Sequence, residues 1–196
     1  MSPRMAVLLL ATSWCLIAPP AAAQWGVTAE IGVARFGGTS RDSSGASLGP
    51  YRPTTLGVHV DREQARLRLQ LGATYAKTGI GGERDGVAFA LYDLAWMVEV
   101  GLRASLAVAN LGAGVVARLE AGPAMHVWSV DGESRTRWAA WGGAAVEWPV
   151  GRRLTGTLRA SGALSRSMFE IEEIPDGVEA LATRRWGVSV ALRYGL

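Results

Sequence analysis

The charged residues of this 196-residue sequence occupy every second position of several apolar segments. A repeat of two is typical of β-strands, because successive side chains of a strand point to opposite faces. The apolar positions of each segment predict one face, and we expect the alternate positions to face a shared interior. The residues of that predicted interior are Glu30, His59, Asp61, Arg66, Arg68, Gln70, Asp93, Glu99, Arg118, Glu120, His126, Arg137, Glu147, Arg159, Arg185 and Arg193.

Opposite charges in such an interior should form ion pairs, because an unpaired buried charge is strongly unfavourable. We therefore predict a lumen charge network. Its members are Glu30, Arg66, Arg68, Asp93, Glu99, Arg118, Glu120, Arg137, Glu147, Arg159 and Arg193. The alternative is that the same side chains line a narrow pore or a ligand site.

His126 and Ser129, in the segment MHVWS, are the residues that could form a nucleophile and its general base. On a strand, a spacing of three places the two side chains on opposite faces, so proton transfer between them fails on geometry. His59 has no serine close to it in the sequence, and a hydrogen-bonded interior histidine is the simpler interpretation. We expect no catalytic residues and no enzymatic step.

The segment FEIEEIPDGVEA carries five carboxylates that could bind a divalent cation or a basic partner, namely Glu170, Glu172, Glu173, Asp176 and Glu179. Calcium loops need carboxylates at set spacings around a tight turn, and this segment has no such spacing. A solvated acidic loop is the favoured interpretation. The sequence has no glycine-rich phosphate loop, and Cys15 is its single cysteine. We expect neither a cofactor nor a metal.

The elements that position these residues are eight predicted strands of about ten residues, which suit a barrel wall better than a soluble sandwich. Their apolar positions span 25–33, 56–60, 67–75, 92–100, 117–127, 138–148, 154–164 and 186–196. The predicted fold class is all-β: an eight-stranded antiparallel up-and-down transmembrane β-barrel that follows a cleaved signal peptide. A barrel of eight strands is just wide enough for side chains to fill its interior.

The predicted connections alternate in length, as those of outer-membrane barrels do. Mostly short connections at one end are Arg62–Ala65, Arg103–Gly114 and Pro149–Arg153. Connections at the other end, richer in glycine, serine and charge, are Gly37–Pro53, Lys77–Gly86, Ser129–Ser134 and Arg166–Thr183. Within the first group, the segment ASLAVANLG could hold a strand end or a short helix.

Aromatic side chains stand near both ends of the predicted strands, where tryptophan and tyrosine prefer the membrane interfaces. Trp138 and Trp148 bracket one strand, and ten residues at about 3.3 Å with a tilt of about 40° span roughly the height of the lipid-facing band. Interface positions are also predicted for Trp25 and Tyr194 at one end and for Tyr75, Tyr92 and Trp128 at the other.

The N-terminus is typical of a secretory signal peptide, with Arg4, an apolar run and a small-residue cleavage site at Ala21–Ala23. The apolar run is too short to span a bilayer of about 30 Å at about 1.5 Å per residue. The predicted domains are a signal peptide, residues 1–23, and an outer-membrane β-barrel domain, residues 24–196.

Mass spectrometry of the protein from purified outer membranes should therefore find Gln24 as the first residue. Cys15 follows the bulky Trp14, unlike a lipoprotein attachment site, so no lipid is expected on it. An intact Met1 or a lipidated Cys15 would contradict the predicted cleavage and the topology that depends on it.

The segments LYDLAWMVEVGLR and GVVARLEAGPAMHVW resemble the central hairpin of small eight-stranded outer-membrane barrels of the OmpA, OmpX and opacity-protein kind. The resemblance is one of pattern and covers the whole mature chain. It implies a bacterial outer-membrane location with both termini in the periplasm. It also implies that the last strand is recognised by the barrel-assembly machinery. That strand usually ends in an aromatic residue, whereas this one ends in Leu196, two residues after Tyr194.

These observations predict a structural or surface-interaction protein whose lumen is filled by a charged side-chain network. A narrow porin-like or hydrophobic-solute channel is the alternative. A lipid-modifying enzyme is a remote one, because lipid A deacylases place the serine two residues after the histidine. Expected partners are outer-membrane lipid, the assembly machinery and an unknown extracellular ligand of the loops. Loss of Arg4 lowers the net charge from +3 to +2, too balanced to indicate nucleic-acid binding.

Overall fold

The computed structural model describes residues 24–37, 40–42, 47–84, 87–130, 132–167, 178–179 and 181–196. Side chains are described for 24–37, 53–78, 95–129, 132–167 and 181–196. The predicted signal peptide and most of the acidic segment Glu170–Glu179 lie outside the described residues. Among the described residues, no helix is long and apolar enough to cross a membrane.

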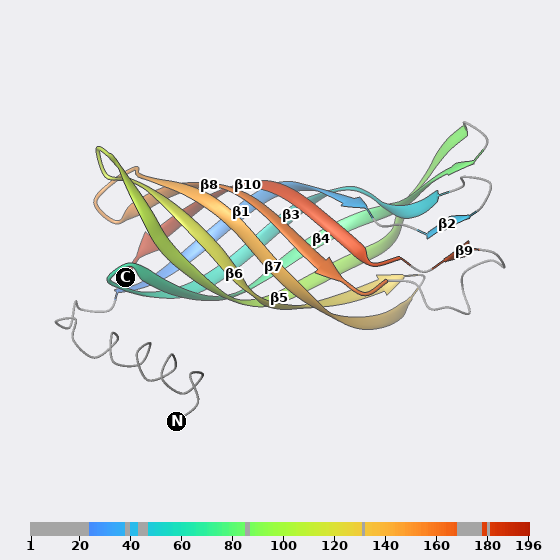
Figure 1. Cartoon of the computed structure of the whole chain (residues 1–196), viewed down its shortest axis with the longest axis horizontal. Coiled ribbons are helices and arrows are strands. Elements are labelled where there is room, and N and C mark those ends of the chain that lie inside the picture. The colour runs from blue at the N-terminus through green and yellow to red at the C-terminus, as the bar shows by residue number, and fades with distance from the viewer. Residues whose placement is uncertain are drawn as a thin grey trace, which may run out of the picture.

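Eight antiparallel strands form a closed barrel in the described part of the chain (Figure 1). They are β1 (Gln24–Gly37), β3 (Ser47–Gln64), β4 (Leu67–Arg84), β5 (Val87–Gly112), β6 (Val115–Val130), β7 (Glu133–Pro149), β8 (Leu154–Ser165) and β10 (Thr183–Gly195). Two short strands, β2 (Ser40–Asp42) and β9 (Val178–Glu179), pair with each other outside the barrel wall. The predicted fold class and strand number are confirmed.

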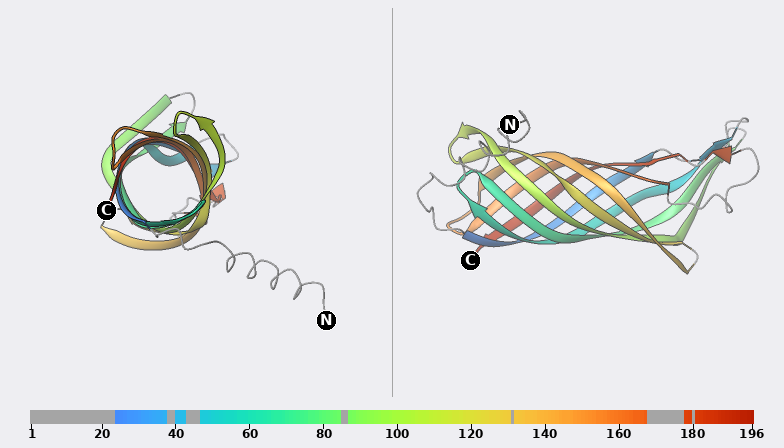
Figure 2. Two further views of the ribbon diagram at one scale, coloured as in Figure 1. Left: turned by 90° about the vertical axis from the view of Figure 1, so that its left-hand side faces the viewer. Right: turned by 60° about the horizontal axis from the view of Figure 1, so that its bottom comes forward.

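The barrel closes because β1 pairs with both β3 and β10. The β1–β10 register runs from Gly26 opposite Gly195 to Gly37 opposite Arg184. Viewed along its axis, the barrel is a ring without a free edge (Figure 2, left). A closed sheet satisfies its backbone hydrogen bonds internally, which a strand in lipid requires.

The two faces of the wall differ sharply in exposure, as the last strand illustrates. Trp186 and Val190 are 67% and 52% exposed on the outer face of β10, whereas Ser189 and Arg193 on its inner face are 7% and 6% exposed. The outward residues of the other strands are likewise exposed and apolar, including Ile31, Val58 and Leu71. The barrel therefore has an apolar outer wall and a polar, charged interior, the distribution found in transmembrane barrels.

Both ends of the described chain and three short connections lie at one end of the barrel, which we call the turn end (Figure 1). These connections are Ala65–Arg66, Ala113–Gly114 and Val150–Arg153. At the opposite end, the loop end, β4 and β5 continue beyond the barrel as a hairpin. The two long connections, from β1 to β3 and from β8 to β10, are at the loop end, but β4 to β5 and β6 to β7 are joined there by two residues each, so the predicted alternation of lengths holds only in part.

The predicted connection Arg103–Gly114 is wrong, because β5 continues to Gly112. The turn is only Ala113–Gly114, whose φ values of 50° and 77° are the two positive φ angles of a type I′ hairpin turn. The segment ASLAVANLG is strand and contains no helix. Its apolar residues keep the outward period of two as far as Leu106 and Val108, and two register shifts in the pairing with β6 then end the strand.

Candidate functional site: the barrel lumen

Near the turn end, six charged side chains form one ion-paired group, which we call the turn-end cluster. Its members are Asp61, Glu63, Arg68, Arg118, Glu147 and Arg193. Arg68 Nε lies 3.6 Å from Asp61 Oδ1 and joins the Asp61–Arg193 pair to the rest. Arg68 donates to Glu147 (Nη2 to Oε2, 3.1 Å) and to Glu63 (Nη2 to Oε2, 2.8 Å). Arg118 bridges the same two carboxylates, with Nε 2.7 Å from Glu147 Oε2. Each guanidinium thus binds carboxylates that come from different strands.

Arg193 completes the turn-end cluster through Asp61. Arg193 donates from Nη2 and Nε to Asp61 Oδ1 at 2.6 and 2.8 Å. Both side chains are buried, and they come from β10 and β3, which lie on either side of β1. Charge-assisted pairs of this multidentate kind are geometrically specific, so the cluster links side chains of β3, β4, β6, β7 and β10 across the lumen.

Two further groups of charged side chains lie in the lumen, and we call them the central cluster and the loop-side cluster. In the central cluster, Arg159 donates to Glu120 (Nε to Oε2, 2.6 Å) and to Glu30, and His59 Nε2 lies 3.2 Å from Glu30. In the loop-side cluster, one carboxylate, Glu99, has three partners. They are Arg103 Nη2 at 2.9 Å, Arg185 Nη2 at 2.5 Å and His126 Nε2 at 2.9 Å.

The three clusters balance their formal charges when the histidines are neutral. The turn-end cluster has three arginines and three carboxylates. The other two clusters together have three arginines (Arg103, Arg159 and Arg185) and three carboxylates (Glu30, Glu99 and Glu120). The buried charges therefore compensate one another, as a desolvated interior requires.

An apolar group closes the lumen beyond the loop-side cluster. This apolar plug consists of Ala34, Phe36, Ala76, Ala95, Met97 and Trp128. The Phe36 and Trp128 rings meet edge to face, with centroids 5.4 Å apart, a favourable aromatic geometry. Trp128 has no exposed surface, so its predicted position at the membrane interface is wrong. Its inward position on β6, two residues after His126, explains the burial.

The structure brings most of the predicted network residues into these clusters. Glu30, Arg68, Glu99, Arg118, Glu120, Glu147, Arg159 and Arg193 all take part in the ion pairs described above. Arg137 is half-buried near the loop end and donates from Nε to the Ser167 carbonyl at 2.8 Å, outside the three clusters. Asp93 lies in β5, but its side chain is outside the described residues.

Arg66 differs from the prediction. It is exposed in the turn between β3 and β4 and has no place in the lumen. The expected turn, Arg62–Ala65, would have put Arg66 on the inner face of the next strand. The actual connection is the two-residue turn Ala65–Arg66, and β4 begins with Leu67.

Two charged members of the three clusters, Arg103 and Glu63, were absent from the predicted interior. Arg103 was assigned to a turn, yet it is buried, donates to Glu99 and stacks over Trp141 with its guanidinium carbon 4.1 Å from the ring centroid. Glu63 was also assigned to a turn, and it accepts from Arg68 and Arg118. Both retain the inward parity of their strands. Extending the alternation past the assumed turns could have found them.

His126 and Ser129, considered above as a general base and its nucleophile, are held apart by the alternation of side chains along β6. His126 is opposite Glu99 in the β5–β6 register, whereas Ser129 is opposite Trp96, an outward residue. His126 Nε2 is occupied by the Glu99 carboxylate at 2.9 Å. Among the described residues, no group of three or more histidines, cysteines or carboxylates could hold a metal ion.

A small cavity remains in the interior between Glu30, Arg103, Arg185 and Ser189. Its volume is about 20 Å³, which is room for one water molecule. Several buried donors near it, including Arg103 Nε, Arg185 Nη1 and Ser189 Oγ, have no protein partner among the described residues. A water molecule in this cavity would form hydrogen bonds with the buried polar groups that have no partner in the ion pairs.

No protein-family model matches the sequence, and no curated protein is similar to it. Solved outer-membrane proteins share its fold. Outer membrane protein OprG of Pseudomonas aeruginosa is 8% identical, with a TM-score of 0.61 over 89% of this chain and 96% of that one. Neisserial surface protein A is 13% identical, with a TM-score of 0.57 over 86% and 97% of the two chains.

The N-terminal β-barrel domain of Pseudomonas aeruginosa OprF is also similar, at 13% identity and a TM-score of 0.50, over 88% of this chain and 99% of that domain. At such low identities the likeness is one of fold. The chain thus has the fold of the small eight-stranded outer-membrane β-barrels, as its sequence pattern predicted.

Proposed function

We propose that this protein is a bacterial outer-membrane barrel with a structural or surface-interaction role, whose lumen does not conduct ions and which catalyses no reaction. The observation that carries the proposal is the filling of the interior. Three ionic clusters, whose formal charges balance when taken together, and the apolar plug follow one another along the lumen. An ion that entered would have to displace buried ion pairs or cross an apolar layer, and both are energetically costly.

The orientation that we propose places the turn end and both termini in the periplasm and the loop end outside the cell. Short turns are periplasmic and longer connections extracellular in bacterial barrels, and the two longest connections of this barrel, together with the extended β4–β5 hairpin, are at the loop end. The partners that we propose are outer-membrane lipid around the apolar wall and the assembly machinery, which would recognise β10. An extracellular ligand would meet the loop end.

The absence of an enzymatic step is also part of the proposal. Both interior histidines lie beside a carboxylate, His59 beside Glu30 and His126 beside Glu99. A general base must reach the proton of its nucleophile, and the strand parity that separates Ser129 from His126 argues against that pair. No residue is assigned a catalytic role.

Single-channel recording of the refolded protein in planar bilayers tests the closed lumen. We expect no steady open level at any moderate voltage, because an ion would have to break the buried ion pairs and cross the apolar plug. Insertion is verified independently by the heat-sensitive migration of the folded barrel on a gel. A reproducible open level in the wild-type protein would overturn the structural role and favour the narrow channel.

A further inference from the structure

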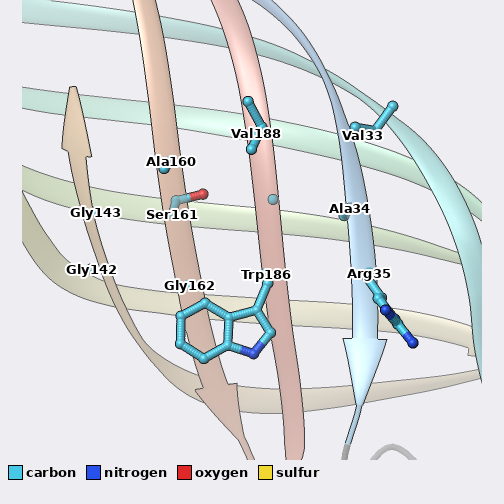
Figure 3. A pocket seen from close by; sticks show the side chains of 11 residues that line it. Val33, Ala34, Arg35, Gly142, Gly143, Ala160, Ser161, Gly162, Trp186 and Val188 are labelled. Carbon is cyan, nitrogen blue, oxygen red and sulfur yellow. The ribbon is translucent and has the colours of Figure 1, made fainter. Parts of the chain in front are cut away.

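The outer wall of the barrel has a groove across β7, β8, β10 and β1, on the half of the wall nearer the loop end (Figure 3). Its volume is about 750 Å³. The floor is made of small residues of adjacent strands, since Gly142 of β7 pairs with Gly162 of β8, and Ala160 lies two residues before Gly162 on the same face. We call this feature the outer groove.

Trp186 forms one side of the outer groove. Its indole is 67% exposed and packs over Gly162, where a Cβ atom would come within 3.1 Å of the ring. Val188 and Val33 continue the apolar lining towards the turn end. In a membrane such a groove is filled by hydrocarbon, because an empty space loses dispersion contacts and water gains no polar partner there. The groove is therefore a binding site that suits a lipid acyl chain.

Two arginines stand at the loop-side end of this lining. Arg35 pairs with Trp186, and Arg184 pairs with Gly37, so the two arginines are diagonal neighbours on the outer face, with Cα atoms about 7 to 8 Å apart for such a pair. Both are exposed, and in Figure 3 the Arg35 side chain lies at the level of the Trp186 ring. Tryptophan marks the interface depth in membranes, which places the guanidiniums at headgroup level.

The charge at this position is uncompensated among the described residues. Neither Arg35 nor Arg184 has an ion pair or side-chain hydrogen bond within the described part of the chain. No carboxylate described on β1, β8 or β10 faces outward. A pair of guanidiniums with free donors binds phosphate well, because each presents a planar fork of N–H groups.

We propose that the outer groove binds a phosphate-bearing lipid of the leaflet at the loop end, with one acyl chain on the Gly142–Gly162 floor and a phosphate held by Arg35 and Arg184. The inference rests on the proposed membrane location but not on the state of the lumen. The proposed ligand is a lipid phosphate and not free phosphate, because free phosphate has no apolar part that could contact the floor of the groove. A second copy of this chain is the competing occupant.

Native mass spectrometry of the refolded barrel in a neutral detergent, titrated with diphosphoryl lipid A, tests the site. We expect one lipid to be retained by the wild type. Arg35→Ala and Arg184→Ala should each weaken binding about fivefold, the fold-change that corresponds to ~1 kcal/mol for one arginine near an anionic lipid. Arg152→Ala, at the exposed turn end, is the matched control and should bind like the wild type.

The floor is tested separately by Gly142→Leu, whose Cβ has ordinary contact distance to its nearest neighbour, Glu120 O, at 3.7 Å. We expect it to fold and to lose the bound lipid. Ala73→Leu places the same side chain on the outer face of β4, away from the groove, and should keep the bound lipid. Monophosphoryl lipid A should bind more weakly than the diphosphoryl form, and excess inorganic phosphate should not displace the lipid.

Several outcomes would overturn the lipid site. One is equal lipid binding by the wild type and the two arginine variants. Another is an equal loss of bound lipid in Gly142→Leu and Ala73→Leu. The third is a wild-type dimer that the Gly142→Leu substitution dissociates. Heat-sensitive gel migration of every variant separates these results from misfolding. If the wild type formed no barrel in lipid or detergent, the proposed membrane function would be wrong. A folded barrel that binds no lipid would refute only the proposed lipid binding in the outer groove.

Discussion

Replacement of Glu99 by leucine is expected to destabilise the barrel by about 3 to 5 kcal/mol, the range for removal of one partner of a buried ion pair. Glu99 is the single carboxylate of the loop-side cluster and is bound by Arg103, Arg185 and His126. Its side chain has no exposed surface. Leucine keeps most of the volume but leaves two guanidiniums without an acceptor, and each then bears its desolvation cost unpaired.

The measurement is a urea titration of the barrel folded in lipid vesicles, followed by tryptophan fluorescence. Glu133→Leu is the matched control, because Glu133 also binds an arginine, Arg135, at 2.9 Å, but its side chain is 73% exposed. The Glu133 carboxylate is hydrated, and Arg135, although buried, keeps a further interaction, so the loss should be about 0 to 1 kcal/mol. The double variant Glu99→Leu with Arg185→Leu should recover part of the loss. Equal destabilisation by Glu99→Leu and Glu133→Leu would contradict the buried cluster.

The strands and their inward and outward faces could be predicted from the sequence because lipid and lumen impose opposite requirements on neighbouring residues. In β10, Val190 and Leu192 face outward while Ser189 and Arg193 face inward, and this contrast repeats with the period of the strand. Closure followed from the same reasoning, since an unpaired edge strand is unfavourable in lipid. The fold was therefore accessible without any related sequence.

The composition of the lumen was less accessible, for three physical reasons. Turn positions were assigned from local composition, so Arg103 and Glu63 were placed outside the wall, although the strands continue through them. Trp128 was assigned to the interface because tryptophan prefers it, whereas its parity buries it against Phe36 and Met97. Which charges meet depends on strand tilt and register, as with Arg193 and Asp61, 132 residues apart. The alternation of residues along a single strand does not show which charged residues of different strands meet.

Val190→Arg is expected to destabilise the barrel by about 2 to 4 kcal/mol, because it places a cation near the bilayer midplane. Val190 is in the middle of β10, opposite Ile31 of β1 and Leu158 of β8. All three are about half exposed on the outer wall, where lipid replaces water. The guanidinium would have no carboxylate within the apolar surroundings, and its side chain would have to extend to an interface to be hydrated.

The decisive measurement is a depth profile, with arginine placed in turn at Val188, Val190, Leu192 and Tyr194 along one face of the strand. We expect the greatest loss in the free energy of folding into vesicles at Val190 and a loss of only about 0 to 1 kcal/mol near the interface at Tyr194. The natural Arg184 occupies the same face at the loop end, which indicates that a cation is tolerated at that depth. A flat profile would contradict a lipid-facing wall, because a solvent-exposed sheet would accept arginine equally at all four positions.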